Sequence, residues 1–384
     1  MEPATNRRDF LKYSAALAAL GLSSNGSGLL ALGAQATPAP LPAPSPAAKK
    51  LKLLILGGTA FLGPAIIDAA KARGHTMTLF NRGKTNPQLY PDLEKLRGDR
   101  DGKLEALVGR KWDAVIDTSA YVPREVKLSA ELLAPNVDQY IFISSVSVYA
   151  QGDEADVDES SAVGKIDDET IETVDGVTYG PLKALCEQAA ERALPGRVTN
   201  IRPGLIVGPG DKSDRFTYWP VRYQRGGEML APIGPDQTMQ IIDVRDLGEW
   251  CVTCLEQKIC GVYNAIGPAK PLRFGELFDA CRSATGSDTR VTWVDAKFLE
   301  EQKIQAWADL PSWIPASEKL GRQPVTSIER AVAKGLKFRP IATTVADLLK
   351  WHAERGPDYK LKARFTSERE QAALAAWHAR DKRG

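Results

Sequence analysis

A tyrosine and a lysine four positions apart are the residues whose types and spacing most directly suggest chemistry. Tyr179 and Lys183 open a segment whose helical pattern continues to Ala193. Residues four apart on a helix lie on one face. A tyrosine hydroxyl, with a pKa ordinarily near ~10, is a poor base at neutral pH, and a nearby ammonium group favours its ionised form. The pair therefore predicts a site at which Tyr179 moves a proton and Lys183 lowers the pKa of Tyr179.

A glycine-rich turn follows the first apolar run of the folded part. The run 51–56 reads as a strand, the turn 57–63 follows, and a helical pattern then continues to Arg73. Strand, glycine turn and helix in this order are what a dinucleotide-binding fingerprint requires, because the helix N-terminus directs backbone N–H groups at the pyrophosphate. Alanine, the smallest replacement, stands at the middle glycine position. The residues expected to bind the cofactor here are Gly57, Thr59, Ala60, Phe61, Leu62 and Gly63.

The end of the second expected strand, 76–80, bears on the choice between NAD and NADP. NAD sites usually place an acidic residue there for the ribose 2′-hydroxyl. This sequence has Asn81 followed by Arg82. A guanidinium group matches a phosphate in bidentate geometry, so Arg82 could pair with the 2′-phosphate of NADP. The pattern favours NADP slightly over NAD.

Strands and helices alternate along the first half of the chain. Further strands are expected at 112–117 and 139–144, with a helical pattern at 126–133 between them. Such alternation predicts an α/β fold with a doubly wound parallel sheet of the Rossmann type and a smaller C-terminal α/β substrate-binding region. The expected divisions are a cofactor-binding domain at 51–210, with core strands continuing to about 265, a mainly substrate-binding region at 211–357 and a helical tail at 358–384.

Taken together, these motifs closely resemble the extended short-chain dehydrogenase/reductase superfamily, in particular the NAD-dependent epimerase/dehydratase family. The resemblance covers residues 51 to about 355. It implies that Ser145 hydrogen-bonds the substrate oxygen and forms a catalytic set with Tyr179 and Lys183. It also implies that Lys183 holds the nicotinamide ribose and that Asp99 contacts the adenine.

The segment 215–220 combines an arginine with aromatic residues. Arg215 and Trp219 could face a sugar or a flat ring, and the alternative is plain packing at the start of a helix. Cys251 and Cys254 are spaced like a redox pair, but they lie in a helical pattern and are expected to be buried apolar thiols. No group of histidine, cysteine and acidic residues shows metal-ligand spacing, so no metal is expected.

The N-terminus resembles a twin-arginine export signal. Arg7 and Arg8 precede the apolar run 13–22, which is too short to span a membrane comfortably. A signal peptide at 1–36 and a proline- and alanine-rich linker at 37–50 would place the enzyme in the periplasm after passage through the twin-arginine machinery, without stable membrane insertion after cleavage. A chance arginine pair and an uncleaved anchor remain as alternatives.

Three function classes follow. The first is an epimerase or dehydratase acting on a sugar or nucleotide sugar, because an exported enzyme that reduces and reoxidises one tightly held cofactor needs no external supply. The second is a net NADP-dependent reductase or dehydrogenase of a small carbonyl compound. The third is an RNA-associated protein, because the Gly-Gly-Thr-x-Phe turn also resembles that of the chloroplast stem-loop binding proteins. The net charge of +2 over 384 residues, without a basic stripe, argues against nucleic acid. A small-molecule substrate is expected, and a homodimer is left open.

Overall fold

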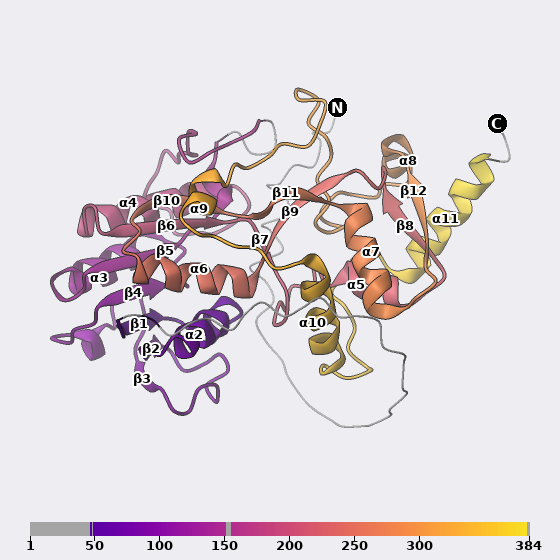
Figure 1. The fold of residues 1–384 in the computed structure, drawn as a ribbon. Coiled ribbons are helices and arrows are strands. Elements are labelled where there is room, and N and C mark those ends of the chain that lie inside the picture. Colours follow the sequence, from indigo (N-terminus) through magenta and orange to yellow (C-terminus); the bar gives the residue numbers. More distant parts are fainter. Residues whose placement is uncertain (1–46, 48, 151–154, 382–384) are drawn as a thin grey trace.

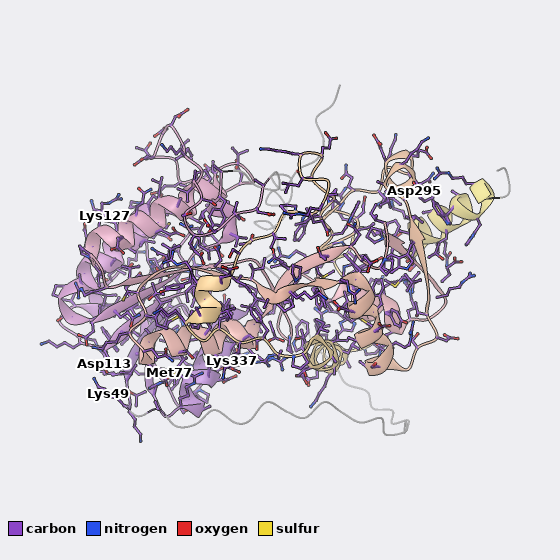
Figure 2. All side chains as sticks on the ribbon, turned by 45° about the horizontal axis from the view of Figure 1, so that its top comes forward. Lys49, Met77, Asp113, Lys127, Asp295 and Lys337 are labelled. Carbon is purple, nitrogen blue, oxygen red and sulfur yellow. The ribbon has the colours of Figure 1, made fainter. Side chains whose placement is uncertain are left out.

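The computed structural model describes residues 47, 49–150 and 155–381 (Figure 1). The expected signal segment, 1–36, and nearly all of the expected linker, 37–50, lie outside these residues. Within the described ranges, no helix is both long enough and apolar enough to cross a bilayer. Exposed charged side chains such as Lys127 and Asp295 mark opposite ends of the molecule (Figure 2).

A seven-stranded, fully parallel sheet forms the first region. Its spatial order is β10-β6-β5-β4-β1-β2-β3. The strands are β1 (Lys52–Leu56), β2 (Thr76–Asn81), β3 (Glu94–Arg97), β4 (Ala114–Asp117), β5 (Gln139–Ile143), β6 (Val198–Pro203) and β10 (Gly261–Ala265). The direction of winding reverses between β1 and β4, which is where ligands bind in sheets of this type. The predicted Rossmann-type fold is confirmed.

Helices cover both faces of this sheet, as the alternation of side chains along β1 requires. Leu53 and Ile55 pack into the core under α2 (Leu62–Ala72) and α6 (Val244–Glu256). Leu54 and Leu56 pack into the opposite core under α3 (Pro123–Leu133) and α4 (Tyr179–Ala193). Because the β1 side chains from Leu53 to Leu56 are all buried, this part of the strand reads as a continuous apolar run rather than an alternating one.

The second region is smaller and mixed. β7 (Leu205–Val207), β9 (Thr238–Asp243) and β11 (Gly267–Arg273) form one sheet, and β8 (Glu228–Pro232) pairs with β12 (Arg290–Val294). The remaining helices are α5 (Tyr218–Gln224), α7 (Phe274–Thr285), α8 (Ala296–Glu301), α9 (Glu329–Ala333), α10 (Ile341–Ala353) and α11 (Ser367–Asp381). An aromatic core built around Trp219, Phe274 and Phe278 holds most of these elements together.

The C-terminal helix α11 is anchored in this second core. Leu374 is buried there, and the Glu370 carboxylate accepts a hydrogen bond from the Arg222 Nε at 2.5 Å and another from the Leu230 backbone N–H at 3.1 Å. Arg222 and Glu370 are both buried, so their charges depend on each other.

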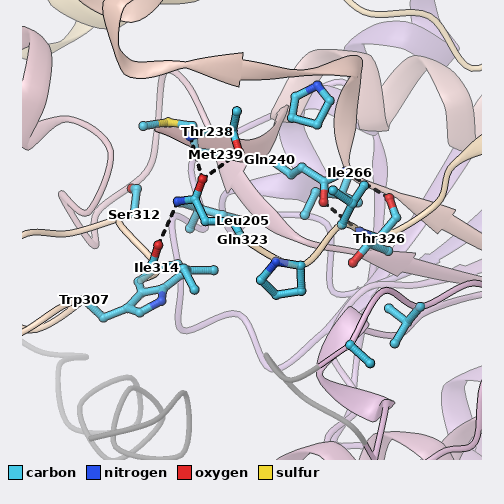
Figure 3. A pocket seen from close by; sticks show the side chains of 15 residues that line it. Leu205, Thr238, Met239, Gln240, Ile266, Trp307, Ser312, Ile314, Gln323 and Thr326 are labelled. Atoms are coloured by element: carbon cyan, nitrogen blue, oxygen red, sulfur yellow. Dashed lines mark hydrogen bonds between the residues drawn. The ribbon is translucent and has the colours of Figure 1, made fainter. Parts of the chain in front are cut away.

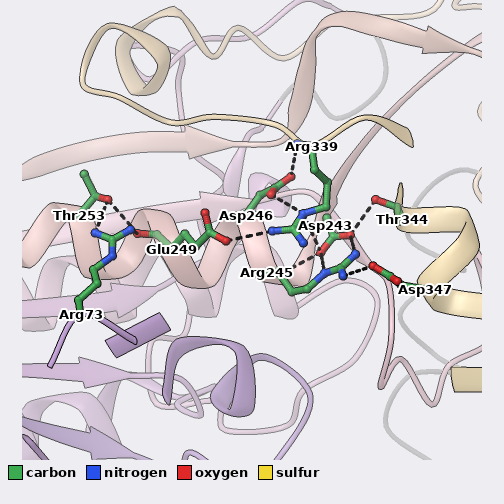
Figure 4. Close-up of polar contacts among 9 residues, drawn as sticks. All are labelled: Arg73, Asp243, Arg245, Asp246, Glu249, Thr253, Arg339, Thr344 and Asp347. Atoms are coloured by element: carbon green, nitrogen blue, oxygen red, sulfur yellow. Dashed lines mark hydrogen bonds and ion pairs between the residues drawn. The ribbon is translucent and has the colours of Figure 1, made fainter. Parts of the chain in front are cut away.

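A network of ion pairs joins the two regions (Figure 4). Asp243 caps the N-terminus of α6 and accepts hydrogen bonds from the Arg245 guanidinium and from the Thr344 hydroxyl at the start of α10. The Arg339 Nε donates to the neighbouring Asp246 at 2.6 Å. Burial raises the pKa of Asp246 to about 6, although Arg339 opposes the shift. The network therefore fixes the start of α10 against α6.

Candidate active site

The glycine turn lies at the carboxyl end of β1 and opens α2. A Cβ atom at Gly63 would lie 2.4 Å from the carbonyl carbon of Gly58, so only glycine allows this approach. Phe61 precedes α2 and, as an apolar residue, offers no side-chain cap to the first N–H groups of the helix. The first turn of α2 also contains no acidic residue. Uncapped N–H groups at a helix start suit the pyrophosphate of a dinucleotide, so the turn fits the cofactor.

Asn81 ties the end of β2 to this turn. Its Nδ2 donates to the Gly57 carbonyl oxygen at 2.9 Å, and its Oδ1 accepts from the Gly83 N–H at 2.9 Å and from Arg97 at 2.5 Å. The Arg82 side chain, next to Asn81 in the chain, is exposed. Arg97 is therefore a second cation close to the expected ribose position, and sequence reasoning missed it because it lies on β3.

Ser145 and Tyr179 meet at the ends of β5 and α4. The Ser145 Oγ accepts a hydrogen bond from the Ser147 N–H at 3.1 Å and so caps the short 3₁₀ helix Val146–Val148. α4 packs directly on this segment, because a Cβ atom at Gly180 would lie 2.1 Å from the Ser147 carbonyl oxygen. The close approach places the Tyr179 side chain near Ser145, whose hydroxyl lowers the pKa of Tyr179.

Burial and the neighbouring Tyr121 raise the pKa of Tyr179 to about 12. The contact with Ser145 and the cation of Arg215 act in the opposite direction. The Tyr121 ring is 50% exposed and its centroid lies 6.3 Å from that of Tyr179. Without a ligand, Tyr179 is therefore a proton donor at neutral pH.

Lys183 is buried one turn further along α4. Its Nζ donates to the Ala120 carbonyl oxygen at 2.9 Å and to the Ile143 carbonyl oxygen at 2.6 Å, and it lies 4.2 Å from the centroid of the Phe142 ring. Burial lowers the pKa of Lys183 to about 8. This differs from the expectation that Lys183 lowers the pKa of Tyr179. The carbonyl oxygens of Ala120, in the loop after β4, and of Ile143, at the end of β5, accept hydrogen bonds from the ammonium. A cation that lowers the pKa of the phenol is Arg215.

The two residues expected to face the substrate have different environments. Arg215 is partly buried, its Nε donates to the Ser213 Oγ at 2.9 Å, and its charge acts on Tyr179 and on the buried Asp211. Trp219 is 0% exposed, and its Nε1 donates to the Pro311 carbonyl oxygen at 2.6 Å. The prediction of Trp219 as a substrate contact was wrong, because its ring fills the aromatic core.

A buried ion pair under the site was missed by sequence reasoning. Arg100 forms a bidentate pair with Asp117 at the end of β4, and the Tyr140 hydroxyl donates to Asp117 at 2.7 Å. Asp117 also accepts from the Ser119 N–H at 3.2 Å, which fixes the loop that leads to Ala120. A charged residue at the end of an apolar run was the available signal, but its partner in the loop after β3 could not be read from spacing.

The remaining predicted residues lie outside the centre of the site. Asp99 is partly exposed just after β3 and pairs through its backbone with Lys103. Cys251 and Cys254 are free and buried, as predicted, and burial raises their pKa values. Among the described residues, no group of three or more histidine, cysteine or acidic side chains is arranged to hold a metal ion.

The fold and the site define an enzyme of the short-chain dehydrogenase type. Residues 53–265 match the family model described as the NAD dependent epimerase/dehydratase family. The chain therefore belongs to the NAD-dependent epimerase/dehydratase family and uses a nicotinamide cofactor.

Two known relatives are each 28% identical to this chain over the part that can be aligned. The chloroplast stem-loop binding protein of 41 kDa b from Arabidopsis thaliana is 28% identical over 260 residues, which cover 61% of this chain and 63% of that protein. The epimerase family protein SDR39U1 from Bos taurus is also 28% identical, over 62% of this chain and 81% of that protein. The solved structure of UDP-N-acetylglucosamine 4-epimerase from Methanobrevibacter ruminantium M1 superimposes on this chain with a TM-score of 0.59 at 17% identity. The superposition covers 80% of this chain and 100% of the epimerase chain, so the two proteins share a fold.

Proposed function

We propose that this protein is an epimerase or dehydratase that acts on a sugar or nucleotide sugar by transient hydride transfer, with Tyr179 as its acid and base. The observation that carries the proposal is the close packing of α4 on the segment that Ser145 caps, which places Tyr179 near Ser145 at the carboxyl end of the parallel sheet, the same end at which the glycine turn opens α2. That end is where ligands bind in this class of fold.

The chain's own residues have distinct tasks in this proposal. Ser145 donates a hydrogen bond to the substrate oxygen that becomes a carbonyl, and Tyr179 exchanges the proton of that oxygen. Because the pKa of Tyr179 is raised to about 12, its action as a base depends on nearby cations, of which Arg215 is one. When bound, the nicotinamide supplies a carbon that accepts and returns a hydride.

Lys183 is suited to hold the cofactor rather than the substrate. An ammonium group has three N–H donors, and two of them are used by Ala120 and Ile143. The third is available for a ribose hydroxyl. The turn Gly57–Gly63 would hold the pyrophosphate.

The test is the variant Tyr179→Phe, with bound nicotinamide measured by mass spectrometry and turnover measured on a panel of sugars and nucleotide sugars. We expect the variant to lose turnover and to retain the cofactor, because the phenol touches the substrate and not the pyrophosphate. Loss of both folding and cofactor would make Tyr179 a structural residue. Stoichiometric consumption of added NADPH by the natural protein would favour the net reductase instead.

We also propose NADP as the preferred cofactor. Support comes from the exposed Arg82, from the nearby Arg97 and from the absence of an acidic residue at position 81. These cations lie where the second strand ends, next to the glycine turn. The charge reversal Arg82→Glu tests this preference.

Export by the twin-arginine route remains part of the proposal. Its support is the pair Arg7 and Arg8 and the short apolar run that follows them. Replacement of both arginines by lysine should leave the protein in the cytoplasm when cell fractions are compared by immunoblot. Unchanged distribution between the fractions would contradict the export signal.

An RNA-associated function is the second candidate, because one relative is a stem-loop binding protein. The near-neutral charge does not favour it. A complex with stem-loop RNA that persists at physiological salt, and weakens as salt rises, would support it.

A further inference from the structure

A small cavity lies next to the segment that carries Ser145. Its volume is about 60 Å³, several times the roughly 10–15 Å³ that one water requires, and it is enclosed by β9 and by the stretch 307–326 (Figure 3). Two of its lining residues, Val157 and Ile266, pack in one cluster with Val146 and Val148. The latter two belong to the 3₁₀ helix that Ser145 caps. The cavity therefore adjoins the support of the proposed reactive pair.

The cavity is polar but uncharged. None of the lining residues that the structure describes has an ionisable carboxylate, ammonium or guanidinium group. Its polar side chains are Thr238, Gln240, Ser312, Gln323 and Thr326, and its largest flat surface is the ring of Trp307. A diphosphate is normally bound by arginine or lysine side chains or by a helix N-terminus. Hydroxyl groups of a neutral sugar are matched by amides, hydroxyls and an aromatic face.

The two carboxamides of the cavity are fixed by hydrogen bonds. Gln323 accepts from the backbone and hydroxyl of Thr238 at 2.6 and 2.7 Å, and donates to the Ile314 carbonyl oxygen at 2.7 Å. Gln240 pairs with the backbone of Thr326 at 2.8 and 2.9 Å. An amide nitrogen has two N–H donors, and these contacts use one on each side chain. The second N–H group of each amide is therefore already fixed in position. A ligand that accepts a hydrogen bond from it would not have to order the side chain, which favours binding.

Ser312 supplies an independent observation. It is 4% exposed, and its hydroxyl finds no hydrogen-bond partner within the part of the chain that the structure describes. A buried hydroxyl without a partner is costly, and a ligand hydroxyl would satisfy it. Ser312 and Trp307 also have left-handed backbones, with φ of 66° and 62°. Such conformations are rare outside glycine and cluster at ligand sites.

We propose that this cavity holds a neutral sugar ring, so that the enzyme acts on an uncharged sugar or glycoside and not on a nucleotide sugar. The statement about catalysis rests on the function proposed above. The statement about binding does not, because it depends only on the lining of the cavity.

The test compares neutral and charged ligands by titration calorimetry on the full-length purified protein. The neutral probes are D-glucose, D-galactose and their methyl glycosides, and the charged probes are UDP, UDP-glucose and UDP-galactose. We expect at least one neutral sugar to bind, UDP to bind undetectably, and the UDP-sugars to bind no tighter than the neutral sugars. Tighter binding of UDP than of every neutral probe, or no binding of any neutral probe, would overturn the proposal.

Two variants locate the binding. Ser312→Ala removes a hydroxyl that has no partner within the described chain, so we expect an unchanged melting temperature and at least tenfold weaker sugar binding. Thr217→Val is the matched control, because its hydroxyl is also buried without a partner among the described residues but does not line the cavity. Equal affinities of Ser312→Ala and the natural protein would exclude the cavity as the sugar site.

A second measurement distinguishes failure of the sugar-binding site from failure of the proposed hydride-transfer function. Reduction of bound nicotinamide is followed by absorbance after each probe is added. If sugar binding depends on Ser312 but no nicotinamide is reduced, the proposed function is contradicted and the proposed binding site is supported. Reduction by UDP-sugars alone would support the proposed function and refute the neutral substrate.

Discussion

The buried ammonium of Lys183 should make the stability of this protein depend on pH in a defined direction. Burial lowers the pKa of Lys183 from its ordinary 10.5 to about 8 in the folded protein. Between these values the unfolded chain binds more protons than the folded one, so the free energy of unfolding rises with pH across this window. At about 1.4 kcal/mol for each pKa unit, the full gain is about 3 kcal/mol.

The assay is urea denaturation of the natural protein and of Lys183→Met from about pH 7 to about pH 10.5. We expect the natural protein to gain about 3 kcal/mol relative to the variant, because Tyr179 and the other titrating groups are present in both and cancel. Lys297→Met, which removes an exposed lysine, is the control for the change in net charge and should follow the natural protein. Parallel pH profiles of Lys183→Met and the natural protein would refute the reasoning.

Three further predictions concern other parts of the chain. Arg82→Glu should weaken NADP more than tenfold relative to NAD in titrations of the cofactor-free protein, and equal weakening of both would remove the proposed 2′-phosphate contact. Gly180→Ala should reduce turnover at least tenfold in steady-state assays, because its Cβ would lie 2.1 Å from the Ser147 carbonyl oxygen and must push Tyr179 away from Ser145. Retained turnover would show that α4 can shift without cost. Glu370→Ala should destabilise the protein by about 3–5 kcal/mol in urea denaturation, because it leaves the buried Arg222 uncompensated. A loss below about 1 kcal/mol would mean that Arg222 reaches solvent.

The sequence was a good guide wherever local patterning decides the outcome. The apolar run before Gly57 and the helical pattern after it determine β1 and α2, because both are short-range features. The segment that begins at Tyr179 forms a helix for the same reason. These elements suffice to predict the parallel sheet, since its topology follows from their alternation.

Contacts between distant segments could not be predicted in the same way. The aromatic residues and the arginine near Trp219 in the sequence suit a sugar site. The Trp219 ring nevertheless packs against Phe274, more than fifty residues away in the sequence. The direction of the Lys183 side chain is set by one carbonyl oxygen in the loop after β4 and one at the end of β5, which spacing along α4 does not reveal. The cavity combines β9 with Ser312 and Gln323, and only tertiary packing brings these together.

The ion network between α6 and α10 limits how the protein could be recombined with its relatives. Asp243 caps and Asp246 belongs to the helix that covers the cofactor-binding sheet, whereas Arg339 and Thr344 belong to the closing segment. A chimera whose closing segment lacked Arg339 and Thr344 would leave the buried Asp246 without its guanidinium partner, and Asp243 would keep Arg245 but lose its hydroxyl partner. Exchange of substrate preference by domain grafting would therefore succeed only when α6 and residues 339–347 are transferred as one unit. In this sense the boundary between the two functional halves lies within the network and not at a loop.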